Sequence, residues 1–267
     1  MLRPRYFSRS PAEAAPWLWA LFGGMLGLIL AMVWLAPASW LASALDRATS
    51  GRIQVVNTVG TAWTGSGQLL LTGGTGSRDR ATLPGRVNWK LRLDGFALGL
   101  ELNAECCTPR PLQARARPRW GGVSMQIVDG ASEWPASLLE GLGAPWNTLQ
   151  ADGRLRLITQ GLSVEWFKQQ PTLAGRAELT AVALTSSLTT LKPRGSYQVL
   201  LLGGNTIEVK LATLEGNLLL SGSGRWVGPR LSFEGIASAA PGYEAALANL
   251  LNIIGRRSGA RSIITLG

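Results

Sequence analysis

The side chains that most often perform catalysis or bind metal ions are sparse in this sequence. It contains no histidine and only two cysteines, which are neighbours. The absence of histidine excludes Ser–His–Asp and Cys–His catalysis, H-E-x-x-H zinc sites and the commonest general base. With one adjacent cysteine pair as the only other soft ligands, we expect neither a transition-metal site nor a cofactor. The sequence also lacks a G-x-x-x-x-G-K-[ST] phosphate loop.

The two cysteines are Cys106 and Cys107. Adjacent residues of a strand point to opposite faces, and the spacing differs from the C-x-x-C pattern of redox and zinc sites. Ordinary disulfide geometry argues against a bond between neighbours. We therefore expect a structurally incidental pair of thiols, with an intermolecular bridge as the alternative in an oxidising compartment.

Paired carboxylates could still hydrolyse a glycosidic bond, because that chemistry depends on distances in space. The available side chains are Asp79, Asp94, Glu101, Glu105, Asp129, Glu133, Glu165, Glu178, Glu208 and Glu234. Most of these carboxylates lie in alternating strand segments or beside turns, where a charged side chain is ordinarily a solvated surface group. We expect no enzyme and no catalytic residue, and an anchored hydrolase that uses two carboxylates is the least favoured alternative.

The longest apolar run of the chain lies near its N-terminus, within a stretch that has no charged residue between Glu13 and Asp46. A helix of about 20 apolar residues crosses the roughly 30 Å hydrocarbon layer and satisfies its own backbone hydrogen bonds. Tryptophans at both ends suit the membrane interface. We predict a transmembrane helix over residues 15–38. Its anchor side chains are Trp17, Trp19, Leu21, Phe22, Leu26, Leu28, Ile29, Leu30, Val33, Trp34 and Leu35.

The charges on either side of this run predict its orientation. Arg3, Arg5 and Arg9 precede it, whereas the first charges after it are the mixed pair Asp46 and Arg47. This asymmetry places residues 1–14 in the cytoplasm as a tail and residues 39–267 outside it. The alternative is a cleaved secretory signal ending near Ala42-Ser43-Ala44. An apolar core of about 19 residues exceeds the usual signal core of about 7–15, which favours a retained anchor.

Composition indicates a folded, β-rich domain beyond the anchor. The chain has 267 residues, of which 46% are hydrophobic, 16% are charged and 33 are glycines, which is too apolar for disorder. The net charge of +10 comes mostly from scattered single arginines. No basic run or basic helix could follow a phosphate backbone, so nucleic acid is not an expected partner. Membrane lipid is an expected partner, because arginines close to the bilayer attract anionic headgroups.

Alternation of apolar and polar residues predicts an antiparallel sheet with one dry and one wet face. The segment from Val87 to Asp94 alternates without an error, and shorter stretches around Val123 and Leu155 continue the pattern. The dry-face residues, as core or as the lining of an apolar groove, are Val87, Trp89, Leu91, Leu93, Leu98, Leu100, Leu102, Ile207, Val209 and Leu211.

Two segments break the strand pattern. Residues 135–142 predict a short internal helix that ends before Gly143 and Pro145. Residues 243–254 predict a C-terminal amphipathic helix. Its apolar face either packs on the core or binds a partner, and it consists of Leu247, Leu250, Leu251 and Ile254.

Several stretches, taken in order, resemble a known family. An N-terminal span is followed by Pro37-Ala38-Ser39-Trp40-Leu41 and then by the stretch from Gly60 to Leu69, Gly-Thr-Ala-Trp-Thr-Gly-Ser-Gly-Gln-Leu. Later stretches are 193–197, 213–222 and 250–257. In this order the chain resembles type II secretion system protein N, the general secretion pathway N component of Gram-negative bacteria.

The resemblance implies an accessory, structural subunit of the cell inner membrane that supports export of folded periplasmic proteins across the outer membrane. Residues 39–267 would then be periplasmic, and the partners would be other secretion subunits in the inner membrane and periplasm. No catalytic residue comes with the family. It also looks distantly like the AsmA group, which implies an elongated, curved sheet. In that alternative the chain is an envelope protein that handles lipid or glycan, with lipid sheltered in an apolar β-groove.

Overall fold

A computed structural model describes residues 17–144, 146–167, 170–186, 195–227 and 230–267. The predicted tail, the first two residues of the predicted span and part of the family-like stretch 193–197 lie outside the described residues. The chain divides into two compact units, residues 1–36 and 37–267. Each unit is described by itself.

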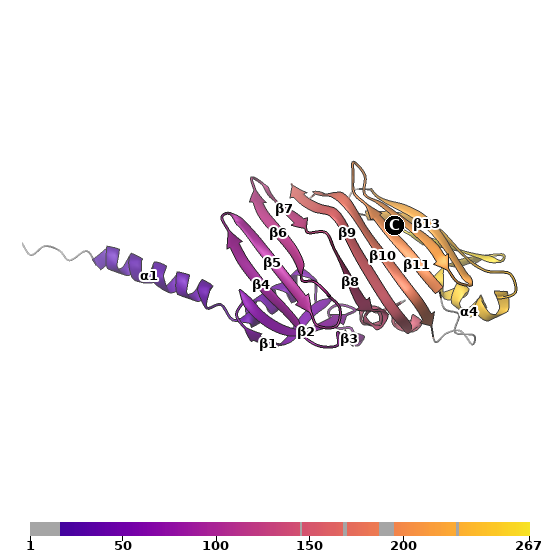
Figure 1. The fold of residues 1–267 in the computed structure, drawn as a ribbon, viewed down its shortest axis with the longest axis horizontal. Coiled ribbons are helices and arrows are strands. Elements are labelled where there is room, and N and C mark those ends of the chain that lie inside the picture. Colours follow the sequence, from indigo (N-terminus) through magenta and orange to yellow (C-terminus); the bar gives the residue numbers. More distant parts are fainter. Residues whose placement is uncertain (1–16, 145, 168–169, 187–194, 228–229) are drawn as a thin grey trace, which may run out of the picture. The chain divides into compact units, whose positions relative to one another are not determined.

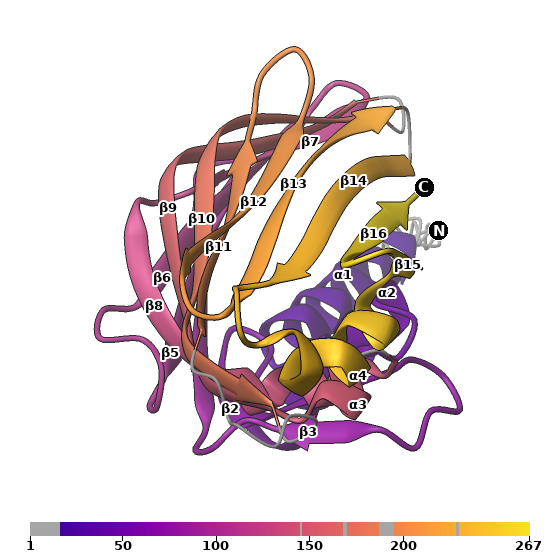
Figure 2. The same ribbon diagram turned by 90° about the vertical axis from the view of Figure 1, so that its right-hand side faces the viewer.

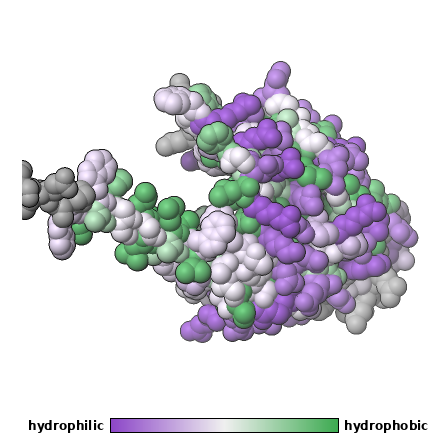
Figure 3. All heavy atoms as spheres, turned by 60° about the vertical axis from the view of Figure 1, so that its left-hand side comes forward, coloured by the Kyte–Doolittle hydropathy of each residue, from purple (hydrophilic) through white to green (hydrophobic). Residues whose placement is uncertain are grey.

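The first unit contains the helix α1, Trp17–Trp34. It ends four residues before the end of the predicted span at residue 38, and Pro37 disfavours helical backbone at the residue before it. Its 18 residues extend about 27 Å at about 1.5 Å per residue. Hydrophobic and near-neutral residues cover the surface of α1 that is visible in Figure 3. It is the one described helix long and apolar enough to cross a membrane.

The second unit is built on one sheet of sixteen strands among the described residues, and every pair of neighbouring strands is antiparallel. The strands are β1 Ile53–Gly60, β2 Thr64–Thr72, β3 Arg80–Thr82, β4 Val87–Asp94, β5 Ala97–Ala104, β6 Leu112–Arg119, β7 Gly122–Ile127, β8 Gly130–Pro135, β9 Ala151–Phe167, β10 Gln170–Ser186, β11 Gly195–Leu202, β12 Glu208–Glu215, β13 Leu218–Val227, β14 Arg230–Ala239, β15 Arg256–Ser258 and β16 Arg261–Leu266. Their order in the sheet follows their order in the chain almost throughout (Figure 1).

Helices of the second unit lie on one side of the curved sheet (Figure 2). The short internal helix η1, Ala136–Leu142, is a 3₁₀ helix that ends at Gly143 and is followed by α3, Trp146–Leu149. The C-terminal helix α4 spans Glu244–Ile254. These elements, with the curved antiparallel sheet and the N-terminal apolar helix, confirm the predicted mainly β fold.

The helix α2, Ala38–Ala48, was not predicted from the sequence. It packs against β1 and begins directly after Pro37, a residue that suits a helix start. Its two charged residues, Asp46 and Arg47, lie near its C-terminus and its first half continues the uncharged stretch of the anchor, so the helix was not recognised as a separate element.

Three apolar clusters form the core of the second unit, and all lie where a helix meets the sheet. In the first, Leu138 of η1 packs with Leu83 and Val87. In the second, the leucines of α4 pack with Leu218 and Ala237. The third joins Ala136 of η1 to Ala151 and Leu155 of β9. Burial is therefore concentrated at one end of the strands.

The expectation that Cys106 and Cys107 are unbonded neighbours is wrong for this structure, because the two form a disulfide with each other. The prediction assumed strand backbone, in which consecutive side chains point to opposite faces. The pair lies instead in the turn between β5 and β6. Cys107 is buried in the first core cluster, and its carbonyl oxygen accepts a hydrogen bond from the Glu133 N–H at 2.8 Å. The turn is thereby connected to β8.

Candidate functional site, an apolar sheet face

Strand register places apolar residues from many strands on one face of the sheet, which we call the apolar face. Residues directly opposite in neighbouring antiparallel strands point to the same side. In the first half of the sheet one such row runs through Leu93, Leu98, Ala116, Met125, Val164 and Leu173. The row crosses six strands without a polar residue.

The second half of the sheet continues the apolar face. A row there runs through Leu157, Leu179, Val199, Leu211, Gly222, Gly235 and Ile264. At Gly222 and Gly235 the side chain of Phe233 occupies the space, because a Cβ added at Gly222 would lie 2.5 Å from its ring. The face is therefore apolar across both halves. In the first half each strand contributes its own apolar side chain, whereas in the second half the ring of Phe233 covers two glycines.

Helices cover the apolar face at one end of the strands. η1 packs on β2, β3 and β9, and α4 packs mainly on β14, β15 and β16. Leu247 and Leu251 of α4 are completely buried or nearly so. We call this region the covered end.

The opposite end of the same face, in the first half of the sheet, is open. Its side chains are Leu93, Val123, Met125 and Trp166, which are 64%, 48%, 38% and 54% exposed. They come from β4, β7 and β9, and Val123 lies directly opposite Trp166. We call these four residues the open end. A contiguous exposed apolar patch of this kind marks an interaction surface more often than isolated apolar residues do.

The structure divides the predicted dry-face residues between these two regions. Val87 and Trp89 are buried, and Leu93 belongs to the open end. The half-buried members, on β4, β5 and beside or within β12, are Leu91, Leu98, Leu100, Leu102, Ile207, Val209 and Leu211. In the C-terminal helix, Leu247, Leu250 and Leu251 are buried and Ile254 packs beside them, so this face contacts the core.

Three open-end residues, Val123, Met125 and Trp166, were missing from the predicted dry-face set. Val123 and Met125 were recognised as strand residues, but their short alternating stretch is separate from the longer run Val87–Asp94 that defined the dry face. For Trp166 the reason is a change of phase at Gly161, a left-handed residue (φ 56°) where β9 shifts its register against β10. Odd-numbered residues face the apolar side before this shift and even-numbered ones face it afterwards.

The other face of the sheet is polar and carries the carboxylates. Glu133 forms ion pairs with Arg154 and Arg156, and Glu178 forms one with Arg176. A hydrogen bond from Arg156 lowers the pKa of Glu133, and hydrogen bonds from Arg176 and Gln198 lower the pKa of Glu178. A general acid for glycoside hydrolysis needs a raised pKa, so these side chains are unsuited to that role.

Metal binding finds no support in the described part of the chain, where no group of three or more cysteine, aspartate and glutamate side chains is placed to hold an ion. The membrane-anchor residues from Trp17 to Trp34 all lie on α1, and Leu35 follows its last turn. All eleven are exposed in the first unit. This is consistent with an anchor or with a signal sequence.

Comparison with protein-family models found a match to type II secretion system (T2SS), protein N, over residues 51–264. The chain belongs to the type II secretion system protein N family. Membership implies, at family level, a role in type II secretion and association with other subunits of that system. The family comprises structural components of the cell envelope and is not a known enzyme family. Searches of the curated proteins and of the solved structures found no match.

Proposed function

We propose that the protein is a single-pass inner-membrane subunit of a type II secretion system, which acts through contacts with other subunits and not through catalysis. The observation that carries the proposal is the family match over residues 51–264. In this arrangement residues 1–14 are cytoplasmic, residues 15–38 span the membrane and residues 39–267 are periplasmic. The apolar helix α1 and the excess of arginine before it support that topology.

The open end is the surface best suited to contact with a partner. Leu93, Met125 and Trp166 are exposed apolar side chains on one face, and Leu98 and Ala116 fill the row between Leu93 and Met125. The cores of protein interfaces are depleted in charge and enriched in aromatic residues and methionine. On the opposite face of β6, Arg115 and Arg117 provide a contrasting charged surface.

The proposal is tested by deletion of the gene followed by assay of exported enzymes in the culture fluid. Site-specific photocrosslinkers at Leu93 and Met125 should capture other secretion subunits in intact cells, whereas a crosslinker at Arg117 on the opposite face serves as the control. Normal export without the protein, together with no secretion subunit among the crosslinked products, would contradict it. Recovery of a soluble periplasmic chain that begins near Leu45 would contradict the anchored topology.

A second candidate function is the sheltering of lipid on the apolar face, and the exposure of the open end is the observation that favours it. An acyl chain covering Leu93, Val123 and Trp166 would remove apolar surface from water, at about 25 cal/mol per Å². Mass spectrometry of lipid extracted from the purified full-length protein tests this function. Met125→Asp should reduce the amount of bound phospholipid and Arg117→Asp should not. Equal lipid content in the two variants would argue against it.

A further inference from the structure

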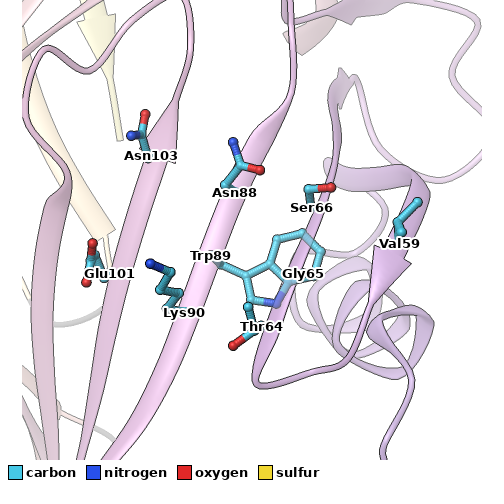
Figure 4. A pocket seen from close by; sticks show the side chains of 9 residues that line it. All are labelled: Val59, Thr64, Gly65, Ser66, Asn88, Trp89, Lys90, Glu101 and Asn103. Atoms are coloured by element: carbon cyan, nitrogen blue, oxygen red, sulfur yellow. The ribbon is translucent and has the colours of Figure 1, made fainter.

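A polar hollow of about 400 Å³ lies on the sheet face opposite the apolar face, over β2, β4 and β5. Figure 4 shows the side chains that line it, among them Thr64, Ser66, Asn88, Lys90, Glu101 and Asn103. Its size falls within the range of about 300–1,000 Å³ that is usual for ligand sites. Neither the secretion role nor the lipid alternative uses this surface.

Strand register brings the polar side chains of the hollow together. Asn88 lies directly opposite Ser66 on one side and Asn103 on the other. Lys90 lies in the same way between Thr64 and Glu101. With neighbouring strands about 4.8 Å apart, the six side chains form two short rows across about 10 Å of the sheet.

Three side chains of the hollow have hydrogen-bonding groups without a partner in the described protein. Asn88, Lys90 and Glu101 take part in none of its side-chain hydrogen bonds or ion pairs, although Lys90 and Glu101 are opposite charges in directly paired positions. Elsewhere on this face Glu133 and Glu165 do form ion pairs with arginine. The hollow thus keeps an ammonium, a carboxylate and an amide available to a ligand.

The remaining polar groups are held in place by the protein. The Ser66 hydroxyl accepts hydrogen bonds from two nitrogens of Arg86, at 3.2 and 3.0 Å. The Asn103 side-chain oxygen accepts one from the Thr108 hydroxyl at 3.2 Å, which leaves its NH₂ group to donate. Both anchors reduce the conformational freedom that binding would otherwise remove.

The base of the hollow is fixed by Gly65 and Trp89, which are directly paired across β2 and β4. A Cβ at Gly65 would lie 2.6 Å from the indole ring and 2.8 Å from the carbonyl oxygens of Val59 and Thr61. The indole N–H donates to the Ala62 carbonyl oxygen at 3.1 Å. Only glycine lets the two strands and the indole pack this closely, so the lining groups stand on a rigid base.

We propose that this hollow binds a segment of an uncharged glycan. The lining contains one positive and one negative side chain, Lys90 and Glu101, and the guanidinium of Arg86 is held beside it at Ser66. Amide and hydroxyl groups that both donate and accept, together with one ammonium and one carboxylate, match the alternating donors and acceptors of sugar hydroxyls and N-acetyl groups. The lining also includes the apolar side chains of Val59 and Trp89, which can pack against the carbon atoms of a sugar ring.

The test is titration of N-acetylglucosamine tetramer into the full-length protein in nanodiscs, followed by isothermal calorimetry. We expect saturable binding that Asn88→Ala and Glu101→Ala each weaken about tenfold, because each variant removes a hydrogen bond to the ligand. Both side chains are at the surface, and a thermal unfolding scan checks that each variant is folded. Glu208→Ala is the matched control, since Glu208 lies on the same face in β12.

Three outcomes would overturn the proposal. The first is absence of binding of the tetramer by the natural protein. The second is binding that Asn88→Ala and Glu101→Ala leave unchanged. The third is competition by inorganic phosphate at equal concentration, which would indicate an anion site centred on Lys90. All three leave the secretion role untouched, because that role is tested by export and crosslinking.

Discussion

Two groups of strands, a first group β4–β7 and a last group β13–β16, present the same apolar face of the sheet. The face is partly exposed in the first group and covered in the last. In the last strands α4 covers the face, and glycines beside Phe233 let the ring lie flat on the sheet. In the first strands the face is buried only near Val87 and becomes exposed toward Leu93. A sheet face can therefore be equally apolar along its length while serving as core in one region and as open surface in another.

The difference comes from the connections and not from the strands. η1, α3 and α4 all lie in connections at one end of the strands, so the helices reach the covered end and leave the other end of β4–β7 unoccupied. Alternation within a strand records which residues share a face. It contains no information about which part of that face a distant helix will cover.

The largest expected effect tests the covered end. Leu251→Ala should lower the free energy of unfolding by about 2–5 kcal/mol, because Leu251 is 1% exposed and truncation leaves a cavity. Leu93→Ala at the open end should change it by less than about 0.5 kcal/mol, as surface substitutions do. Chemical unfolding of the full-length protein, followed by tryptophan fluorescence, measures both. Equal losses would remove the distinction between the two ends.

A second pair of variants compares close packing with open space. Gly65→Ala should destabilise the protein by about 1–3 kcal/mol, because the added methyl meets the Trp89 ring and two backbone oxygens. Gly99→Ala should be nearly neutral, since the closest atom to its Cβ is the Arg92 carbonyl oxygen at an ordinary 3.6 Å. Thermal unfolding of the two variants side by side measures the contrast, and a destabilised Gly99→Ala would show that the polar face is packed more tightly than described.

Alkaline pH provides a smaller test of burial at the covered end. Burial raises the pKa of Tyr197, which packs against the second core cluster, to about 12. Its folded-state pKa is thus above the unfolded value of about 10. The associated stability is complete below about pH 10 and is lost as the pH rises toward 12. Tyr197→Phe should flatten this decline in melting temperature, and an unchanged pH profile would mean that the side chain is solvated.

The smallest effect is expected on the polar face. The pKa of Glu133 is lowered by Arg156, so the stabilisation from this pair is present above the unfolded pKa and is lost as the pH falls through the folded one. Glu133→Gln should reduce the acid sensitivity of the melting temperature, and added salt should reduce the difference from the natural protein. A large change that persists in high salt would indicate a buried pair.

The sequence predicted the strands more accurately than it predicted which part of the sheet the helices cover. The segment Val87–Asp94 is a strand with the predicted bounds, because eight alternating residues carry an unambiguous period. The helix α4 was also predicted, within one residue, from its spacing and its flanking glycines. Both features are local, and local patterns are what a single sequence records most reliably.

Features that depend on long-range pairing were not predictable. The six side chains of the polar hollow come from β2, β4 and β5, and their proximity depends on the pairing of β2 with β4, whose paired residues Ser66 and Asn88 are separated by β3 in the chain. The disulfide of Cys106 and Cys107 depends on a turn where a strand was assumed. The exposure of Trp166 depends on a bulge that only the pairing of β9 with β10 reveals.

The near-identity of chain order and sheet order has a consequence for how the domain forms. Most strands pair with the strand made just before them, so each step closes a short loop instead of waiting for a distant segment. Because the chain is synthesised from its N-terminus, the domain can therefore assemble by adding one strand at a time to a growing edge. The last addition is α4 with β15 and β16, so completion of the fold is delayed until almost the whole chain has emerged.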